Sequence, residues 1–256
     1  MKKKNKILVI IGDDKSSIKV SESILKYLNS LNKNNEYYFL IMSNAKNLKK
    51  ISKKNVIKTN FSQFQKKLKK NDYDWLLSIW SAEIYNKEFL SKFKKNLNLH
   101  PSYLPFNRGK DPYCWSIYDR TPMGVTIHEM NEKIDKGRIY IRKKISLSFP
   151  ISAYQVYLSS LNEIKNLFIK NWLKIKQGKI KLKKIKYSKR LNFRKEYIKH
   201  TFLDLDKNNN ENKIIKKFIY KILSCDFSEI NSLKIKLNKK IFETKIDLNK
   251  KIKPKL

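Results

Sequence analysis

The segment KILVIIGDDKSSIKVSESILKYLNSL, which spans residues 6–31, decides the fold prediction. Its first part, from Lys6 to Gly12, is a short apolar run that ends at a glycine, as expected of a buried strand. A polar stretch follows, and residues 18–31 then carry apolar side chains at helical spacing. This order of strand, loop and helix indicates the opening unit of an α/β sheet.

The alternation of strands and helices continues along the chain. The sequence predicts further strands at residues 37–42, 55–59, 74–80, 96–100, 124–130 and 138–147, and helices at residues 61–70, 87–93 and 152–178. We therefore predict an α/β fold with a mostly parallel, Rossmann-like sheet that helices cover on both faces.

The residue pattern of the chain changes after Gly178, and we therefore predict a domain boundary near residue 180. Residues 1–180 would form the main domain. Residues 181–256 would form a small C-terminal α+β appendage, with a helix near 211–223 and a β-hairpin made by residues 233–237 and 241–248.

The charge of the chain is its most unusual bulk property. The 256 residues carry a formal net charge of +37, yet only six of the 59 basic residues are arginines and the lysines are spread from end to end. A nucleic-acid site would favour clustered arginines, whose planar fork pairs with phosphate. We therefore expect the lysines to cover solvated surfaces and expect no nucleic-acid partner. The alternative to an enzyme is a basic module that binds RNA or anionic membrane without catalysis.

The sequence lacks the motifs that several other classes of protein require. The longest apolar runs fall far short of the roughly 20 residues that span a bilayer, so we expect a cytoplasmic protein without membrane association. Only five glycines are present, and neither GxGxxG nor GxxxxGK[ST] occurs. The three histidines form no HExxH, and the isolated Cys114 and Cys225 form no CxxC, so we expect neither a metal site nor a disulfide.

The segment NLHPSYLPFNRGKDPYCWSIYDRTPMGVTIHEMNEKIDKG, residues 98–137, carries the candidate chemistry. Asn98 and His100 are two apart on a predicted strand, so their side chains share a face at the carboxyl edge of the sheet, where open α/β folds place their ligands. Asp135 lies in a polar turn that can return to the same edge. Alone, each motif is more often an ordinary turn; together they supply an amide donor, a base that titrates near neutral pH and a carboxylate.

This segment resembles the formyltransferase family that uses 10-formyltetrahydrofolate. The pattern of that family runs Asn-x-His, Leu-Pro-x-x-Arg-Gly, a Pro and a Trp, Gly-Val-Thr-x-His and Asp-x-Gly. The matching residues are Asn98, His100, Leu104, Pro105, Arg108, Gly109, Pro112, Trp115, Gly124, Val125, Thr126, His128, Asp135 and Gly137. The resemblance implies that residues 1–180 form the formyltransferase catalytic domain.

The resemblance also implies roles for individual residues. A primary amine would attack the formyl carbon, Asn98 and His100 would stabilise the oxyanion, and Asp135 would orient His100 or a water and relay the proton. No metal is needed. We interpret His128 as a structural histidine. The family binds its pterin largely through backbone groups, and the corresponding cofactor-binding residues here would be Trp80, Ser81, Ala82, Glu83, Ile84, Asn131 and Ile134.

Three acceptors compete within this family: glycinamide ribotide, methionyl-tRNA and a nucleotide-linked amino sugar. The part of the chain after residue 180 is short for the β-barrel of the tRNA enzymes, and the ribotide enzymes usually lack the Arg-Gly after Leu-Pro. The tail at residues 187–206 is similar to that of the sugar N-formyltransferases, which act on dTDP- or GDP-linked 4-amino or 3-amino dideoxy sugars for surface polysaccharide. We therefore expect a nucleotide sugar as substrate.

The expected substrate contacts lie on the loop after His100 and in the tail. They are Ser102, Arg108, Trp115, Tyr187, Lys189 and Phe193. For Arg108, a phosphate contact and an internal salt bridge are equally good interpretations. The C-terminal strands could also pair between two subunits and form a homodimer.

Overall fold

The computed structural model describes most of the chain. The described residues are 4–12, 18–31, 35–41, 55–57, 59–81, 83–147, 151–200, 202–204, 211–225, 233–237 and 240–244. The strands are β1 (Asn5–Ile11), β2 (Asn35–Ile41), β3 (Val56–Ile57), β4 (Trp75–Ile79), β5 (Lys95–His100), β6 (Gly124–His128), β7 (Ile139–Lys144), β8 (Phe202–Asp204), β9 (Leu233–Leu237) and β10 (Lys240–Thr244). The helices are α1 (Ile18–Ser30), α3 (Phe61–Lys67), α4 (Lys87–Ser91), α5 (Pro112–Tyr118), α6 (Ala153–Lys176), α7 (Arg194–His200) and α8 (Glu211–Cys225).

The chain divides into two compact units, and each is built from several segments. The first unit contains Met1–His100, Val125–Lys143 and Leu161–Tyr187. The second contains Pro101–Gly124, Lys144–Ser160 and Ser188–Leu256. The C-terminal residues are thus grouped with two earlier segments, and a separate domain over residues 181–256 stays a prediction.

A seven-stranded sheet forms the centre of the first unit, in the order β3-β2-β1-β4-β5-β6-β7. Strands β1 to β5 pair in parallel, whereas β6 runs antiparallel to β5. The parallel strands β1 and β4 are apolar along nearly their whole length, because helices cover both faces. The predicted α/β, mostly parallel fold is confirmed.

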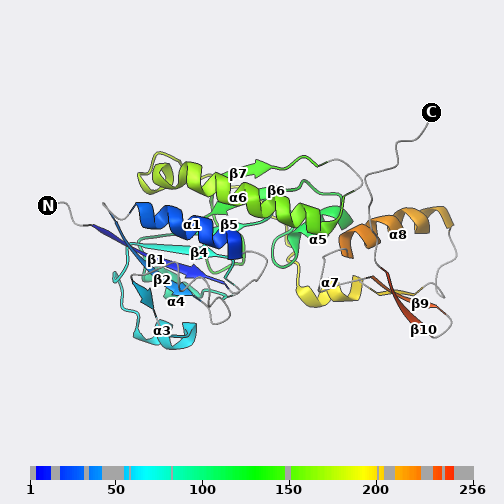
Figure 1. The fold of residues 1–256 in the computed structure, drawn as a ribbon, viewed down its shortest axis with the longest axis horizontal. Coiled ribbons are helices and arrows are strands. Elements are labelled where there is room, and N and C mark those ends of the chain that lie inside the picture. The colour runs from blue at the N-terminus through cyan, green and yellow to red at the C-terminus, as the bar shows by residue number, and fades with distance from the viewer. Residues whose placement is uncertain are drawn as a thin grey trace. The chain divides into compact units, whose positions relative to one another are not determined.

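Helices cover the two faces of this sheet differently (Figure 1). On one face, Leu8 and Ile10 of β1 pack in one core cluster with Phe61 of α3 and Phe89 of α4. On the other face lie α1 and α6, which are joined by an edge-on contact between the rings of Tyr27 and Phe168. Leu76 of β4 belongs to the same core cluster as Phe61 and Phe89, so close packing holds the strand whose carboxyl end leads to the candidate site.

The second unit contains α5, α7, α8 and a small sheet in the order β10-β9-β8. The predicted hairpin is present as the antiparallel pair of β9 and β10, and the residues predicted to extend it, 245–248, lie outside the described residues. Helices α5 and α7 and strand β8 were not predicted from the sequence. Tyr197 of α7 is buried here, and its hydroxyl donates to the carbonyl of Ser224 at 2.6 Å.

Two further observations concern expectations from the sequence. Among the helices over the described residues, none combines the length and the apolar character that a bilayer crossing requires. Cys114 and Cys225 are buried and free.

Candidate active site

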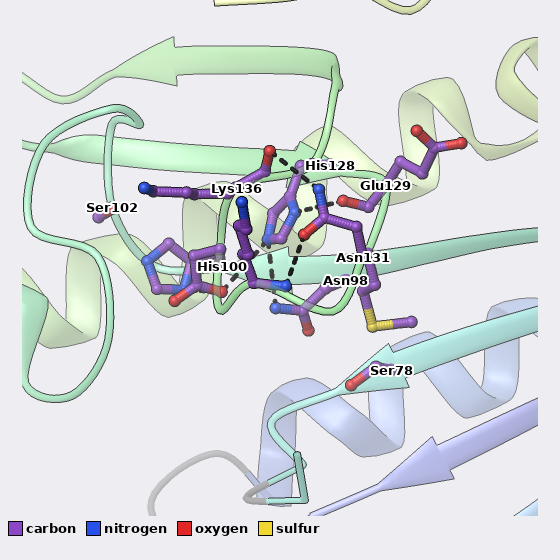
Figure 2. Close-up of polar contacts among 12 residues, drawn as sticks. Ser78, Asn98, His100, Ser102, His128, Glu129, Asn131 and Lys136 are labelled. Atoms are coloured by element: carbon purple, nitrogen blue, oxygen red, sulfur yellow. Dashed lines mark hydrogen bonds and ion pairs between the residues drawn. The ribbon is translucent and has the colours of Figure 1, made fainter. Parts of the chain in front are cut away.

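Asn98 lies on β5, between β4 and the antiparallel strand β6. Its cross-strand neighbours are Ser78 on β4 and His128 on β6, and residues opposite each other in a sheet share a face. The amide nitrogen Nδ2 of Asn98 lies 3.3 Å from Nε2 of His128 (Figure 2). The register of β5 against β6 therefore brings together two polar side chains that are 30 residues apart in sequence.

The hydrogen bonds of His128 define its tautomer. Its Nδ1 lies 2.8 Å from the backbone carbonyl of Glu129, and a carbonyl can only accept, so this nitrogen carries a proton. In the neutral ring Nε2 is then an acceptor, and it receives a hydrogen bond from the amide of Asn98. His128 is almost fully buried, and its acceptor Nε2 faces the NH2 end of the Asn98 amide.

Asp135 lies between two imidazole rings. Its Oδ1 is 3.7 Å from Nδ1 of His100 and 3.5 Å from Nε2 of His128, and only 11% of its side chain is exposed. These separations exceed direct hydrogen-bond lengths and are consistent with electrostatic contact at short range. The structure thus brings the three predicted catalytic residues into one cluster, and His128 is its fourth member.

The turn that carries Asp135 folds back over the sheet. His128 on β6 is opposite Asn98 on β5. Two residues after His128, the backbone N–H of Met130 donates to Oδ1 of Asn96 on β5 at 2.6 Å. The chain therefore leaves β6 on the side of Asn98 away from His100. It must turn back to place Asp135 beside His100, and Asp135 adopts a left-handed conformation with φ 50°.

Local hydrogen bonds close this turn. The amide of Asn131 donates to the carbonyl of Lys136 at 3.2 Å, and Oδ1 of Asn131 accepts from the backbone of Lys133 at 2.9 Å (Figure 2). At its base, Arg138 makes two hydrogen bonds to the carboxylate of Glu129, at 2.8 and 2.9 Å. A planar, two-point pair of this kind fixes the ends of the turn.

The cluster offers a specific set of chemical functions. An amide and an imidazole can donate hydrogen bonds to a developing oxyanion, and a second imidazole and a carboxylate can orient them and move protons. Within the described residues, no group of three or more His, Cys, Asp and Glu side chains is arranged to hold a metal ion. The amide, the imidazoles and the carboxylate together fit polar acyl-transfer chemistry.

The loop predicted to bind a pterin follows β4. Trp80 has a left-handed backbone with φ 54°, and Gly12 approaches it so closely that a Cβ on Gly12 would lie 1.9 Å from the carbonyl oxygen of Trp80. The buried Nε1 of Trp80 has no hydrogen-bond partner among the residues that the structure describes. The loop therefore holds an unused donor, which is compatible with a polar ligand.

The other predicted cofactor-binding residues are at or near the surface. Oγ of Ser81 accepts from the backbone of Glu83 at 3.2 Å, and Ile84 is 72% exposed. Asn131 is exposed and Ile134 is half-buried, whereas Ala82 lies outside the described residues. Their contact with a cofactor stays a prediction.

The predicted substrate contacts belong to both units. Ser102 donates to the carbonyl of Phe106 at 3.0 Å, and the buried Arg108 donates to the carbonyl of Ser188 at 2.8 Å, so Arg108 serves an internal contact in the second unit. Trp115 lies on α5 and is buried, which corrects its assignment to a loop. The two remaining residues of the second unit, Lys189 and Phe193, are exposed.

Tyr187 belongs to the first unit. Its hydroxyl donates to the carbonyl of Gly137 at 2.6 Å, within the segment that follows Asp135. The hydroxyl is therefore used inside the protein. A contact of the ring with a nucleotide stays a prediction.

His128, interpreted from the sequence as a structural histidine, is buried and hydrogen-bonded to Asn98, and its place in the cluster was not predicted. All five residues of β6 are buried, so the pattern of exposure along the strand gives no sign of which side faces the site. The available signal was antiparallel pairing, which would have placed His128 beside Asn98.

Known proteins share this fold. A 4-N formyltransferase from Francisella tularensis superposes with a TM-score of 0.81 at 20% identity, over 96% of this chain and 98% of that one. An N-formyltransferase from Helicobacter canadensis, in complex with folinic acid and dTDP-3-aminofucose, superposes with a TM-score of 0.68 at 19% identity, over 93% of this chain and 85% of that one. These two likenesses show the fold.

Sequence comparison identifies the family. The dTDP-4-amino-4,6-dideoxyglucose formyltransferase of Mycobacterium tuberculosis is 30% identical over 134 residues, which are 52% of this chain and 57% of that protein. The chain therefore matches little more than half the length of this relative. The family model described as "Formyl transferase" matches residues 6–169, which is more than half of the chain and includes the whole cluster around Asn98 and Asp135. The chain thus belongs to the formyl transferase family.

Proposed function

We propose that this protein transfers a formyl group from 10-formyltetrahydrofolate to the amine of a nucleotide-linked amino dideoxy sugar. The observation that carries the proposal is the cluster of Asn98, His100, His128 and Asp135 on one face of the sheet. The family match supports formyl transfer. A relative named for a dTDP-linked amino sugar, and a structural neighbour in complex with dTDP-3-aminofucose, support the choice of acceptor.

The proposed reaction begins with the free amine of the sugar. Its lone pair attacks the formyl carbon, a C–N bond forms, and the carbonyl electron pair moves to oxygen. Asn98 uses one amide hydrogen for His128 and has a second one for the oxyanion. One such donor contributes about 3 kcal/mol to transition-state stabilisation. His100, at the end of the same strand, supplies a further donor.

Collapse of the tetrahedral intermediate completes the transfer. The carbonyl re-forms, the bond from the formyl carbon to the folate nitrogen breaks, and that nitrogen takes up a proton. The amine that attacked must lose a proton in the same cycle, so one proton passes from acceptor to leaving group. Asp135 is placed to guide this transfer, since its carboxylate lies within 4 Å of both imidazole rings.

The co-substrate would bind beside the loop after β4. The Nε1 donor of Trp80, which has no partner among the residues that the structure describes, and the backbone groups at residues 80–84 would hold the polar pterin, together with Asn131 and Ile134 on the turn that carries Asp135. When bound, 10-formyltetrahydrofolate supplies the activated formyl group. Of the predicted substrate residues of the second unit, the exposed Lys189 and Phe193 would contact the nucleotide sugar. A cytoplasmic location and a homodimer through the C-terminal region also stay predictions.

A transfer assay tests the proposal directly. The protein is incubated with 10-formyltetrahydrofolate and a panel of dTDP- and GDP-linked 3-amino and 4-amino dideoxy sugars, and the products are read by mass spectrometry. We expect one formyl group on a nucleotide sugar and no product with Asn98→Ala. Exclusive formylation of methionyl-tRNA or glycinamide ribotide would reassign the acceptor. Absence of transfer to every acceptor, together with RNA binding that weakens with added salt, would support a basic binding module without catalysis.

A further inference from the structure

The segment that follows α6 runs back along the first strand after the Asp135 turn. Ile139 at the start of β7 and Lys183 form an antiparallel bridge, with hydrogen bonds of 2.8 and 2.9 Å in the two directions. In antiparallel pairing, the next residues after Lys183 lie beside the residues that precede Ile139. The bridge therefore directs this segment toward the turn that carries Asp135.

Tyr187 makes the second attachment of this segment. Its hydroxyl donates to the carbonyl oxygen of Gly137 at 2.6 Å, across 50 residues of sequence. Tyr187 is half-buried, so the bond is partly shielded from water. Gly137 thus receives a fixed hydrogen bond two residues after Asp135.

Gly137 is held on its other side by Glu129. A Cβ on Gly137 would lie 1.5 Å from the carbonyl oxygen of Glu129, so the two backbones are in direct contact. The same carbonyl accepts the hydrogen bond from Nδ1 of His128. The position of Gly137 is therefore coupled to His128 through the carbonyl oxygen of Glu129. It is coupled to Tyr187 through the carbonyl oxygen of Gly137 itself.

We propose that Tyr187 is a positioning residue for the formyl transfer, because its hydroxyl fixes the turn that presents Asp135 to His100 and His128. This inference rests on the proposed function for its catalytic consequence. It assigns Tyr187 a role different from a nucleotide contact. Asp135 itself cannot define its position through a regular strand, since it lies in a turn with a left-handed backbone.

The test is Tyr187→Phe, which removes the hydroxyl and retains the ring. We expect kcat to fall about tenfold and KM for the nucleotide sugar to stay within about twofold, since small misplacement of a catalytic group affects the chemical step. The matched control is Tyr38→Phe, which removes a hydroxyl that donates to Glu36 on β2 at 3.0 Å, far along the sheet. The control should retain normal kcat.

Three kinetic outcomes would overturn the inference. A normal kcat with a raised KM would make Tyr187 a substrate contact, and normal values of both would leave it without a role in the site. Equal losses in Tyr187→Phe and Tyr38→Phe would show a general effect on the fold, and this would also count against positioning.

A second measurement does not depend on the proposed function. Ring resonances of the three histidines are recorded by NMR in the wild type and in both variants. In Tyr187→Phe we expect the signals of His100 and His128 to move, with His200 of the second unit as the internal reference. If no acceptor is formylated but these two signals move, the proposed function fails and the positioning contact stands. Unchanged histidine signals would refute the positioning contact.

Discussion

Replacement of Asp135 by Asn tests the electrostatic role of the cluster with little steric change. Asn has nearly the same shape as Asp and accepts a left-handed backbone, so the φ of 50° at this position adds no strain in the variant. The main change is the loss of one negative charge between His100 and His128.

The magnitude follows from the observed distance. At an effective dielectric constant of about 20, a unit charge 3.7 Å from Nδ1 of His100 stabilises a positive imidazole by about 4.5 kcal/mol. If this stabilisation is present only in the transition state, its loss lowers kcat by about a thousandfold. The expected change in KM is small, because the charge acts on His100 and not on bound sugar.

The assay compares steady-state kcat of Asp135→Asn with that of Glu132→Gln. Glu132 is an exposed carboxylate on the same turn, so this control removes an equal charge from the surface and should keep kcat within about twofold. Product is measured as formylated nucleotide sugar by mass spectrometry. If Asp135→Asn lost less than about tenfold in kcat, or if Glu132→Gln lost as much, the charge between the two imidazoles would have no special role.

Three further predictions concern the turn and the second unit. Gly137→Ala should lower kcat strongly, because its Cβ would meet the carbonyl of Glu129 at 1.5 Å; full activity would contradict the tight packing. Tyr197→Phe should lower the free energy of unfolding by about 1–2 kcal/mol in urea, since the buried hydroxyl bonded to Ser224 at 2.6 Å is lost. Burial lowers the pKa of His200 from 6.5, so below that pH the unfolded chain binds more protons than the folded protein, and the free energy of unfolding falls as the pH drops from about 7. In urea titrations at several pH values, His200→Asn should make this fall smaller. An equal dependence of the free energy of unfolding on pH in the wild type and the variant would refute the prediction.

The order of strands and helices in the first unit was predictable because buried parallel strands and amphipathic helices leave clear patterns. Helix α5 was missed for a physical reason. Six of its seven residues, Pro112 to Ile117, are buried, so the helix has no polar face and no amphipathic period. The sequence does carry a start signal, Asp111 followed by Pro112 at the first helical position, although Asp111 adopts a left-handed backbone with φ 53° and makes no capping hydrogen bond.

The candidate site was predictable in part. Asn98 and His100 could be paired from the sequence, because two residues at alternate positions on a strand must share a face. The place of His128 depended on the direction of β6, and apolar composition does not reveal whether a strand is parallel or antiparallel. The distance from Asp135 to the rings depended on the path of a turn, which is set by contacts with residues far along the chain, such as Tyr187.

The direction of β6 explains why the site needs these distant contacts. Had β6 been parallel to β5, its end would have reached the same edge as His100, and the following turn could have delivered a carboxylate there directly. With β6 antiparallel, His128 gains its place opposite Asn98, but the chain then leaves the site. Asp135 returns only through a turn that Glu129 and Tyr187 hold at Gly137. The same reversal that brings the second histidine into the cluster therefore makes the position of the carboxylate depend on hydrogen bonds outside it.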